Sequence, residues 1–181
     1  MIGWGLRLDR RTGGIRLGRS SGIPKVMFRQ QSHDRHRVQV RAPVPEEDHR
    51  PLILFVCVQG AGRSCMAEAF FNKMSHTHRA LSAGTQPAKH PHPEVVAAMR
   101  SVGLEIMDSP GRMLTQELVD QAELVIGMGC TVEEACPALR TPLEDWALDD
   151  PKGRSPEDVA EIRDLIELRV RNLIGKLGRP D

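Results

Sequence analysis

The chain has 181 residues, of which 40% are hydrophobic and 27% charged, a composition typical of a soluble globular protein. No apolar run approaches the roughly 20 residues that a membrane-spanning helix needs, which excludes an integral membrane protein. Aromatic residues are scarce, with four Phe, two Trp and no Tyr. The core must therefore be built mainly from aliphatic side chains and Met.

The formal net charge of +1 hides an asymmetry between the two parts of the chain. Residues 1–50 hold 11 Lys and Arg against 5 Asp and Glu, whereas residues 51–181 hold 14 against 19. Residues 1–50 also show no sustained helical or strand periodicity. We expect them to form a disordered basic extension, followed by one domain over residues 51–181. Because stacking aromatics are nearly absent, we expect no specific nucleic-acid binding. The first residues lack the apolar run of a secretory signal, so we expect a cytoplasmic protein. We also expect it to be a monomer.

The domain begins with a continuous apolar run at residues 51–56, which predicts a strand buried on both faces. The periodicity that follows predicts alternating elements, namely a helix at 64–75, a strand at 80–83, helices at 93–102 and 115–122, and a strand at 124–126.

The last helix has the clearest start. Ser155 suits the N-cap and Pro156 the first helical position. Its apolar stripe consists of Val159, Ile162, Ile166, Val170, Leu173 and Leu177. Alternating strands and helices predict an α/β three-layer sandwich with a short, mostly parallel four-stranded sheet and helices on both faces. Ligands of such sheets bind beyond the carboxyl ends of the strands.

A cysteine loop follows the first predicted strand. Its glycines allow successive N–H groups to turn inward around a tetrahedral oxyanion, and the next helix points its positive end at the same place. The planar guanidinium of Arg63 can bind two oxygens at once. These donors would also stabilise Cys57 as a nucleophilic thiolate. The predicted oxyanion-binding residues are Val58, Gln59, Gly60, Ala61, Gly62, Arg63 and Ser64.

These residues and several others resemble the low-molecular-weight tyrosine phosphatase superfamily, and within it the cysteine-based arsenate reductases, over residues 51–177. The resemblance rests on Ile53-Leu54-Phe55-Val56-Cys57, Arg63-Ser64, Met66-Ala67-Glu68-Ala69, Ser82-Ala83-Gly84, Met128-Gly129-Cys130, Cys136-Pro137, Asp145-Trp146 and Asp149-Asp150-Pro151.

The resemblance implies a role for three more residues. Asp150 would protonate the leaving oxygen, although spacing alone leaves the neighbouring Asp149, or a solvated turn, as alternatives. Cys130 would attack the Cys57 sulfur, and Cys136 would resolve the resulting disulfide. The expected function is reduction of arsenate to arsenite, with no bound cofactor. An external reductant, either thioredoxin or a low-molecular-weight thiol, would restore the enzyme.

A phosphatase would share the first step and then use water instead of a second thiol. Phosphatases of this superfamily usually carry aromatic residues after the Asp-Pro pair, where this chain has Lys152 and Gly153. Because a ring-stacking clamp is missing, a small inorganic oxyanion such as arsenate or phosphate is favoured as the substrate. A phosphatase that uses Cys57, Arg63 and Asp150 is the alternative. A noncatalytic oxyanion or redox sensor is a lesser one.

The remaining cysteine and histidine positions do not indicate a metal site, because the spacings Cys-x7-Cys and Cys-x5-Cys differ from those of zinc knuckles. Relatives commonly have Asn where this chain has Gly60, and Gln or Pro where it has Cys65. Cys65 is open to three interpretations: a spare thiol near the site, a competing disulfide partner for Cys57, or a buried residue of the first helical turn. His90 and His92 are predicted to be solvated residues of a turn.

Overall fold

The computed structural model describes residues 48–130, 132–135, 138 and 140–178. The predicted basic extension lies outside the described residues except for its last three. No helix in the described part is both long and apolar enough to cross a bilayer.

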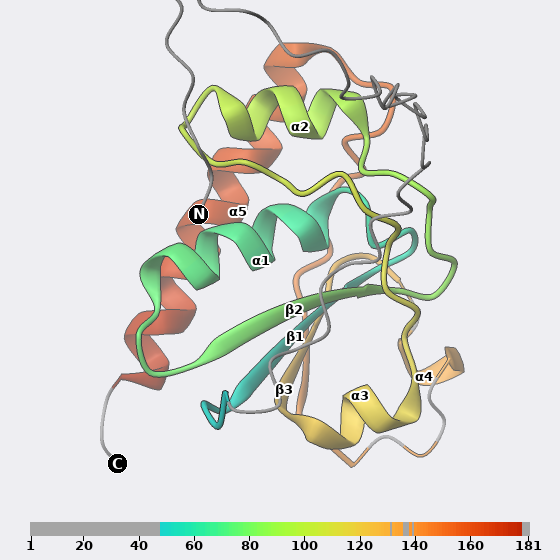
Figure 1. The fold of residues 1–181 in the computed structure, drawn as a ribbon, viewed down its shortest axis with the longest axis vertical. Helices are drawn as coiled ribbons and strands as arrows, with labels where there is room; N and C mark the ends of the chain where they lie inside the picture. The colour runs from blue at the N-terminus through green and yellow to red at the C-terminus, as the bar shows by residue number, and fades with distance from the viewer. Residues whose placement is uncertain (1–47, 131, 136–137, 139, 179–181) are drawn as a thin grey trace, which may run out of the picture. The chain divides into compact units, whose positions relative to one another are not determined.

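Four parallel strands form one sheet in the order β2-β1-β3-β4 (Figure 1). They are β1 (Leu52–Cys57), β2 (Arg79–Gly84), β3 (Ala122–Gly127) and β4 (Leu143–Asp145). The predicted fold class is confirmed. The sequence did not indicate β4, because this edge strand has three residues, two of them exposed, and so lacks an apolar run.

Five helices connect or follow the strands. They are α1 (Arg63–Met74), α2 (Pro93–Arg100), α3 (Gln116–Gln121), α4 (Val132–Ala135) and α5 (Pro156–Leu177). All except the four-residue α4 were predicted to within a few residues. The start of α5 is capped as expected, since the Ser155 hydroxyl accepts a hydrogen bond from the amide of Asp158 at 3.1 Å.

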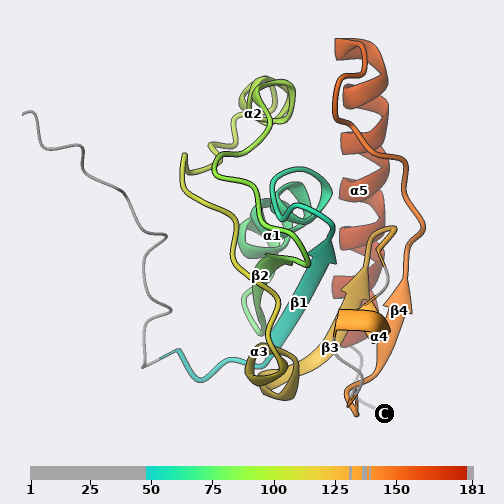
Figure 2. The ribbon, with the colours of Figure 1, turned by 90° about the vertical axis from the view of Figure 1, so that its right-hand side faces the viewer.

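Two apolar layers cover the sheet. All six residues of β1 are buried, and they alternate between the layers because successive side chains of a strand point to opposite faces. Ile53 and Phe55 pack with α1, α2 and α5, whereas Leu54 and Val56 pack with residues of α3 and α4. Figure 1 shows α1 and α5 on one side of the sheet and α3 and α4 on the other. Figure 2 shows α5 running beside the sheet past β4.

The parallel sheet brings four loops to one edge. Because all strands run the same way, their carboxyl ends at Cys57, Gly84, Gly127 and Asp145 meet there. β1 lies between β2 and β3, so the chain leaves β1 toward one side and later returns to the other. Ligands of open α/β sheets bind in the crevice at such a switch point. The loop after β1 and the loop after β3 flank this crevice.

Candidate active site

The loop that follows β1 is held from outside by its carbonyl groups. Each carbonyl from residue 57 to residue 62 accepts a hydrogen bond. The donors are the amides of Thr85 to Cys57 (3.3 Å), Gln86 to Val58 (2.8 Å), Ala88 to Gln59 (2.9 Å), His92 to Ala61 (3.0 Å) and Met66 to Gly62 (3.1 Å), and the thiol of Cys65 to Gly60 (2.9 Å). The segment that follows β2 therefore supports most of this oxyanion loop, residues 57–64.

The direction of these carbonyls fixes the direction of the N–H groups. In a trans peptide unit the C=O and the following N–H point in opposite directions, and the described chain has no cis peptide bond. The amides of residues 58, 59, 60 and 62 consequently point away from the segment after β2, and those of residues 61 and 63 point away from the first turn of α1. One of them, the amide of Gly60, donates to the Cys57 sulfur at 3.2 Å. A ring of inward N–H groups is the arrangement that binds a tetrahedral anion.

Two glycines, one in the loop itself and one at the end of β2, make this loop conformation possible. Gly60 has φ +58°, a left-handed conformation that glycine adopts without strain. A Cβ on Gly84, at the end of β2, would lie 2.6 Å from the Gly60 nitrogen. The backbones therefore approach more closely than any side chain allows, and the Ser-Ala-Gly motif has a steric reason to end in glycine.

The nucleophile candidate lies at the floor of the loop. Cys57 is buried, and its sulfur lies 3.1 Å from the Ser64 hydroxyl in addition to its contact with the Gly60 amide. Both groups can donate hydrogen bonds to a thiolate. Cys65, the next residue after Ser64, is also buried, which agrees with the interpretation of it as a buried residue of the first helical turn. Its thiol donates to the Gly60 carbonyl and lies 3.7 Å from the Ser82 hydroxyl.

Arg63 connects the oxyanion loop with the loop that follows β4, residues 146–154, which we call the acid loop. Its guanidinium is buried and donates to the Leu148 carbonyl at 2.6 Å and to an oxygen of Asp150 at 3.1 Å. Gly129 allows this path, because a Cβ there would lie 2.7 Å from Nη1 of Arg63. The predicted anion clamp and the predicted acid therefore lie in direct contact.

The structure separates the two candidate acids. Asp150 faces Arg63 and also accepts a hydrogen bond from the Lys152 amide at 3.0 Å. Asp149 instead accepts from Arg154 at 3.3 Å, and 75% of its side chain is exposed. This geometry favours Asp150 as the acid.

Cys130 lies in the loop after β3, next to the strand that carries Cys57. Its thiol donates to the Val56 carbonyl at 3.4 Å, and the Met128 amide donates to the same oxygen at 2.8 Å. Burial raises the pKa of Cys130 to about 11, and the negative charge of Cys57 contributes in the same direction. The structure thus brings Cys130 within electrostatic reach of Cys57. Cys136 lies outside the described residues.

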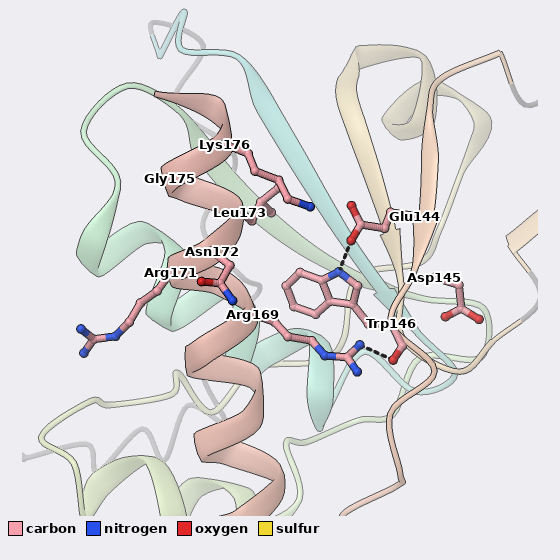
Figure 3. A pocket seen from close by; sticks show the side chains of 9 residues that line it. All are labelled: Glu144, Asp145, Trp146, Arg169, Arg171, Asn172, Leu173, Gly175 and Lys176. Atoms are coloured by element: carbon pink, nitrogen blue, oxygen red, sulfur yellow. Dashed lines mark hydrogen bonds between the residues drawn. The ribbon is translucent and has the colours of Figure 1, made fainter. Parts of the chain in front are cut away.

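A groove of about 570 Å³ lies elsewhere, along the end of β4 and the last turns of α5 (Figure 3). Trp146 forms part of its wall. The indole N–H of Trp146 donates a hydrogen bond to the Glu144 carboxylate, and the Trp146 carbonyl accepts one from Arg169. The Arg169 guanidinium also lies 5.9 Å from the centre of the Trp146 ring. Glu144 and Arg169 thus hold Trp146, the first residue of the acid loop, in the wall of this groove. The predicted catalytic side chains do not line the groove.

Sequence reasoning missed two residues at the edge of the site. His92, predicted to be solvated, is half-buried, and its ring lies within 3.3 Å of the position of a Cβ on Gly62. Glu94, in the first turn of α2, accepts a hydrogen bond from the Gly153 amide in the acid loop at 2.9 Å. An acidic residue in a first helical turn is ordinary, so the sequence carried no signal for this long-range contact. Within the described part, no three His, Cys, Asp or Glu side chains form a potential metal site.

Comparisons with known proteins identify the family of this chain. A Halobacterium salinarum protein that carries the provisional name arsenate reductase is 38% identical over 133 residues, which cover 70% of this chain and 93% of the relative. A Synechocystis protein named glutaredoxin arsenate reductase is 31% identical over 128 residues, covering 70% and 98%. The solved structure of a Corynebacterium glutamicum thioredoxin-dependent arsenate reductase superposes with a TM-score of 0.60 and 30% identity, covering 72% and 63%. Residues 52–180 match the family described as low molecular weight phosphotyrosine protein phosphatase, and the chain belongs to that family.

Proposed function

We propose that this chain is an arsenate reductase that reduces arsenate to arsenite through a relay of three thiols. The observation that carries the proposal is the position of Cys130 in the loop after β3, where its thiol donates to the carbonyl of Val56, the residue before Cys57. A phosphatase completes its reaction with water and does not require a second thiol beside the nucleophile. The names of the relatives support the same activity.

In the first step the Cys57 thiolate attacks the arsenic atom. A sulfur–arsenic bond forms and an arsenic–oxygen bond breaks. Asp150 donates a proton to the leaving oxygen, which departs as water. The amides of residues 58–63 and the Arg63 guanidinium bind the remaining oxygens and stabilise their charge. The raised pKa keeps the Cys130 thiol protonated at neutral pH, so this thiol does not compete with Cys57 for arsenate in the first step.

In the second step Cys130 attacks the Cys57 sulfur after losing its proton. A disulfide forms, the sulfur–arsenic bond breaks, and its electron pair stays on arsenic, which leaves as arsenite. The Cys57 sulfur carries no negative charge in the adduct, so one of the causes that raise the pKa of Cys130 is removed. Cys136 then attacks Cys130 and releases Cys57. An external dithiol reductant, of the thioredoxin or glutaredoxin kind, reduces the Cys130–Cys136 disulfide.

A phosphatase that uses Cys57, Arg63 and Asp150 is the second candidate, because the family match and the first step apply to it equally. The acid loop speaks against a phosphorylated aromatic side chain as substrate. After Pro151 it carries Lys152 and Gly153, which are exposed and form a turn. Neither offers a ring to stack on the substrate.

The deciding experiment measures arsenate-dependent NADPH oxidation with a thioredoxin system, in parallel with hydrolysis of nitrophenyl phosphate. We expect arsenate reduction by the unmodified chain. Cys130→Ser should abolish repeated turnover and leave the first step intact. Equal arsenate turnover in the Cys130→Ser variant would eliminate the relay, and hydrolysis without any arsenate reduction would favour the phosphatase. Binding of oxyanion without either reaction would indicate a sensor.

A further inference from the structure

The acid loop is attached to the rest of the site from two sides. On one side Arg63 bonds Leu148 and Asp150. On the other side the Glu94 carboxylate accepts a hydrogen bond from the amide of Gly153, 59 residues away in sequence. Asp150 is therefore bonded directly by Arg63 and lies three residues before the bond from Gly153 to Glu94. A carboxylate that receives an amide N–H makes a stronger bond than a neutral acceptor.

The turn between Asp150 and Gly153 is stiffened by its own hydrogen bonds. The Lys152 amide donates to the Asp150 carboxylate at 3.0 Å, and the Arg154 amide donates to the Pro151 carbonyl at 3.2 Å. Pro151 is buried, with its ring 3.3 Å from the position of a Cβ on Gly62. A restraint on Gly153 is therefore transmitted through a short, stiff turn to the carboxyl group of Asp150.

The start of α2 is itself fixed to the oxyanion loop. His92, the N-cap residue of α2, donates its amide to the Ala61 carbonyl at 3.0 Å, and its ring packs beside Gly62. Glu94, two residues later, therefore belongs to a helical turn whose position relative to the oxyanion loop is fixed by the hydrogen bond from His92 to Ala61. The first turn of α2 holds both halves of the site, one through its backbone and the other through the Glu94 side chain.

From this geometry we infer that Glu94 is a positioning residue for the general acid, holding Asp150 over the oxyanion loop through the amide of Gly153. The inference rests on the proposed function, in which Asp150 protonates the leaving oxygen. The hydrogen bond from Gly153 lowers the pKa of Glu94 below its ordinary value of 4.5, and the positive charge of Lys152 contributes. The acceptor is therefore a carboxylate at neutral pH.

Three variants separate this role from general stability. Glu94→Ala removes the acceptor. Glu94→Gln keeps an oxygen that can accept from the Gly153 amide but removes the charge. Glu105→Ala is the matched control, because Glu105 is also an acidic residue bonded close to α2, to Arg100 at 3.2 and 3.3 Å, but at the opposite end of the helix from the acid loop.

Arsenate turnover is measured together with the ability of arsenate to protect Cys57 from alkylation. We expect kcat to fall about tenfold in Glu94→Ala, because a displaced acid forfeits part of the 10² to 10⁴ that general acid catalysis contributes. Arsenate affinity from the protection assay should change less than about twofold, since the oxyanion loop keeps its own supports. Glu94→Gln should retain at least about a third of kcat, and Glu105→Ala should behave as the unmodified chain. A general loosening of the site would weaken arsenate binding along with kcat.

Amide exchange at Gly153, followed by NMR in the full chain, tests the contact without any turnover. We expect exchange about tenfold faster in Glu94→Ala than in Glu105→Ala, since a charge-assisted hydrogen bond is lost. Unchanged exchange, unchanged kcat, or an equal loss of kcat in the Gln and Ala variants would each overturn the inference. Failure of the unmodified chain to reduce arsenate would instead refute the proposed function, and Gly153 exchange alone would then decide whether Glu94 holds the turn.

Discussion

The oxyanion loop and the acid loop contribute to the same site but are built in different ways. The oxyanion loop is held by its backbone: five of its six carbonyls, from residue 57 to residue 62, accept backbone amides. The acid loop is held largely by side chains from distant elements, among them Arg63, Glu94 and Arg169. We therefore expect steric changes to damage the first loop and the removal of individual polar side chains to displace the second.

The largest effect is expected at Cys57, the one group that both reaction steps require. Cys57→Ser should lower arsenate turnover at least roughly 10³-fold, because a hydroxyl is a far weaker nucleophile than a thiolate and cannot enter a disulfide. Coupled NADPH oxidation measures this loss. Cys65→Ser is the matched control, since its hydroxyl can still donate to the Gly60 carbonyl. Comparable losses in both variants would mean that the nucleophile has been misassigned.

In the acid loop, replacing Asp150 should lower turnover by about 10², the lower end of the range for general acid catalysis. Asp150→Asn cannot donate the required proton, and its single amide oxygen can accept from only one of the two donors, Lys152 and Arg63, that now bond different oxygens of the carboxylate. Asp149→Asn should stay within about twofold of the unmodified chain, because this exposed residue contacts only Arg154 among the hydrogen bonds described. Steady-state kinetics on the pair distinguishes them. The reverse order of activity would transfer the role of acid to Asp149.

In the oxyanion loop, the corresponding steric change is at Gly84. A Cβ there would lie 2.6 Å from the Gly60 nitrogen and 2.7 Å from the Gln59 carbonyl carbon, so the two backbones must separate. Gly84→Ala should reduce the free energy of unfolding by about 1–3 kcal/mol, the usual cost of overpacking, and weaken the protection of Cys57 by arsenate. Urea unfolding and alkylation measure the two effects.

Gly175→Ala provides the control for this change, because a Cβ at Gly175 in α5 meets nothing within 4 Å. Alanine in the helix interior should raise the free energy of unfolding by about 0.5–1 kcal/mol. If Gly84→Ala were as stable as Gly175→Ala, the close approach of the two backbones would not be a real constraint.

The same contrast explains what the sequence could reveal. Cys57 and Arg63 are only six positions apart in a short loop, so their proximity follows from the local glycines and from the strand that precedes the loop. Ser155 and the stripe of α5 are equally local, and both are confirmed. The contact of Glu94 with Gly153 depends on how α2 packs beside the sheet, and no local pattern encodes it. Strand β4 could not be predicted from the sequence for a related reason. Its three residues form no apolar pattern, and the strand exists because it pairs with β3.

The smallest predicted effect concerns the Gly60 carbonyl, for which the described hydrogen bonds include a side-chain donor and no backbone amide. The Cys65 thiol donates to the Gly60 carbonyl at 2.9 Å, at the position where the neighbouring carbonyls receive backbone amides. Cys65→Ala removes this donor from a buried site, and we expect a loss of about 1 kcal/mol in the free energy of unfolding with a few-fold fall in turnover. Cys65→Ser should recover most of both. Urea unfolding of the two variants gives the comparison. An alanine variant as stable and active as the serine variant would show that the backbone supports alone suffice, and the contrast between the two loops would then be sharper than the structure suggests.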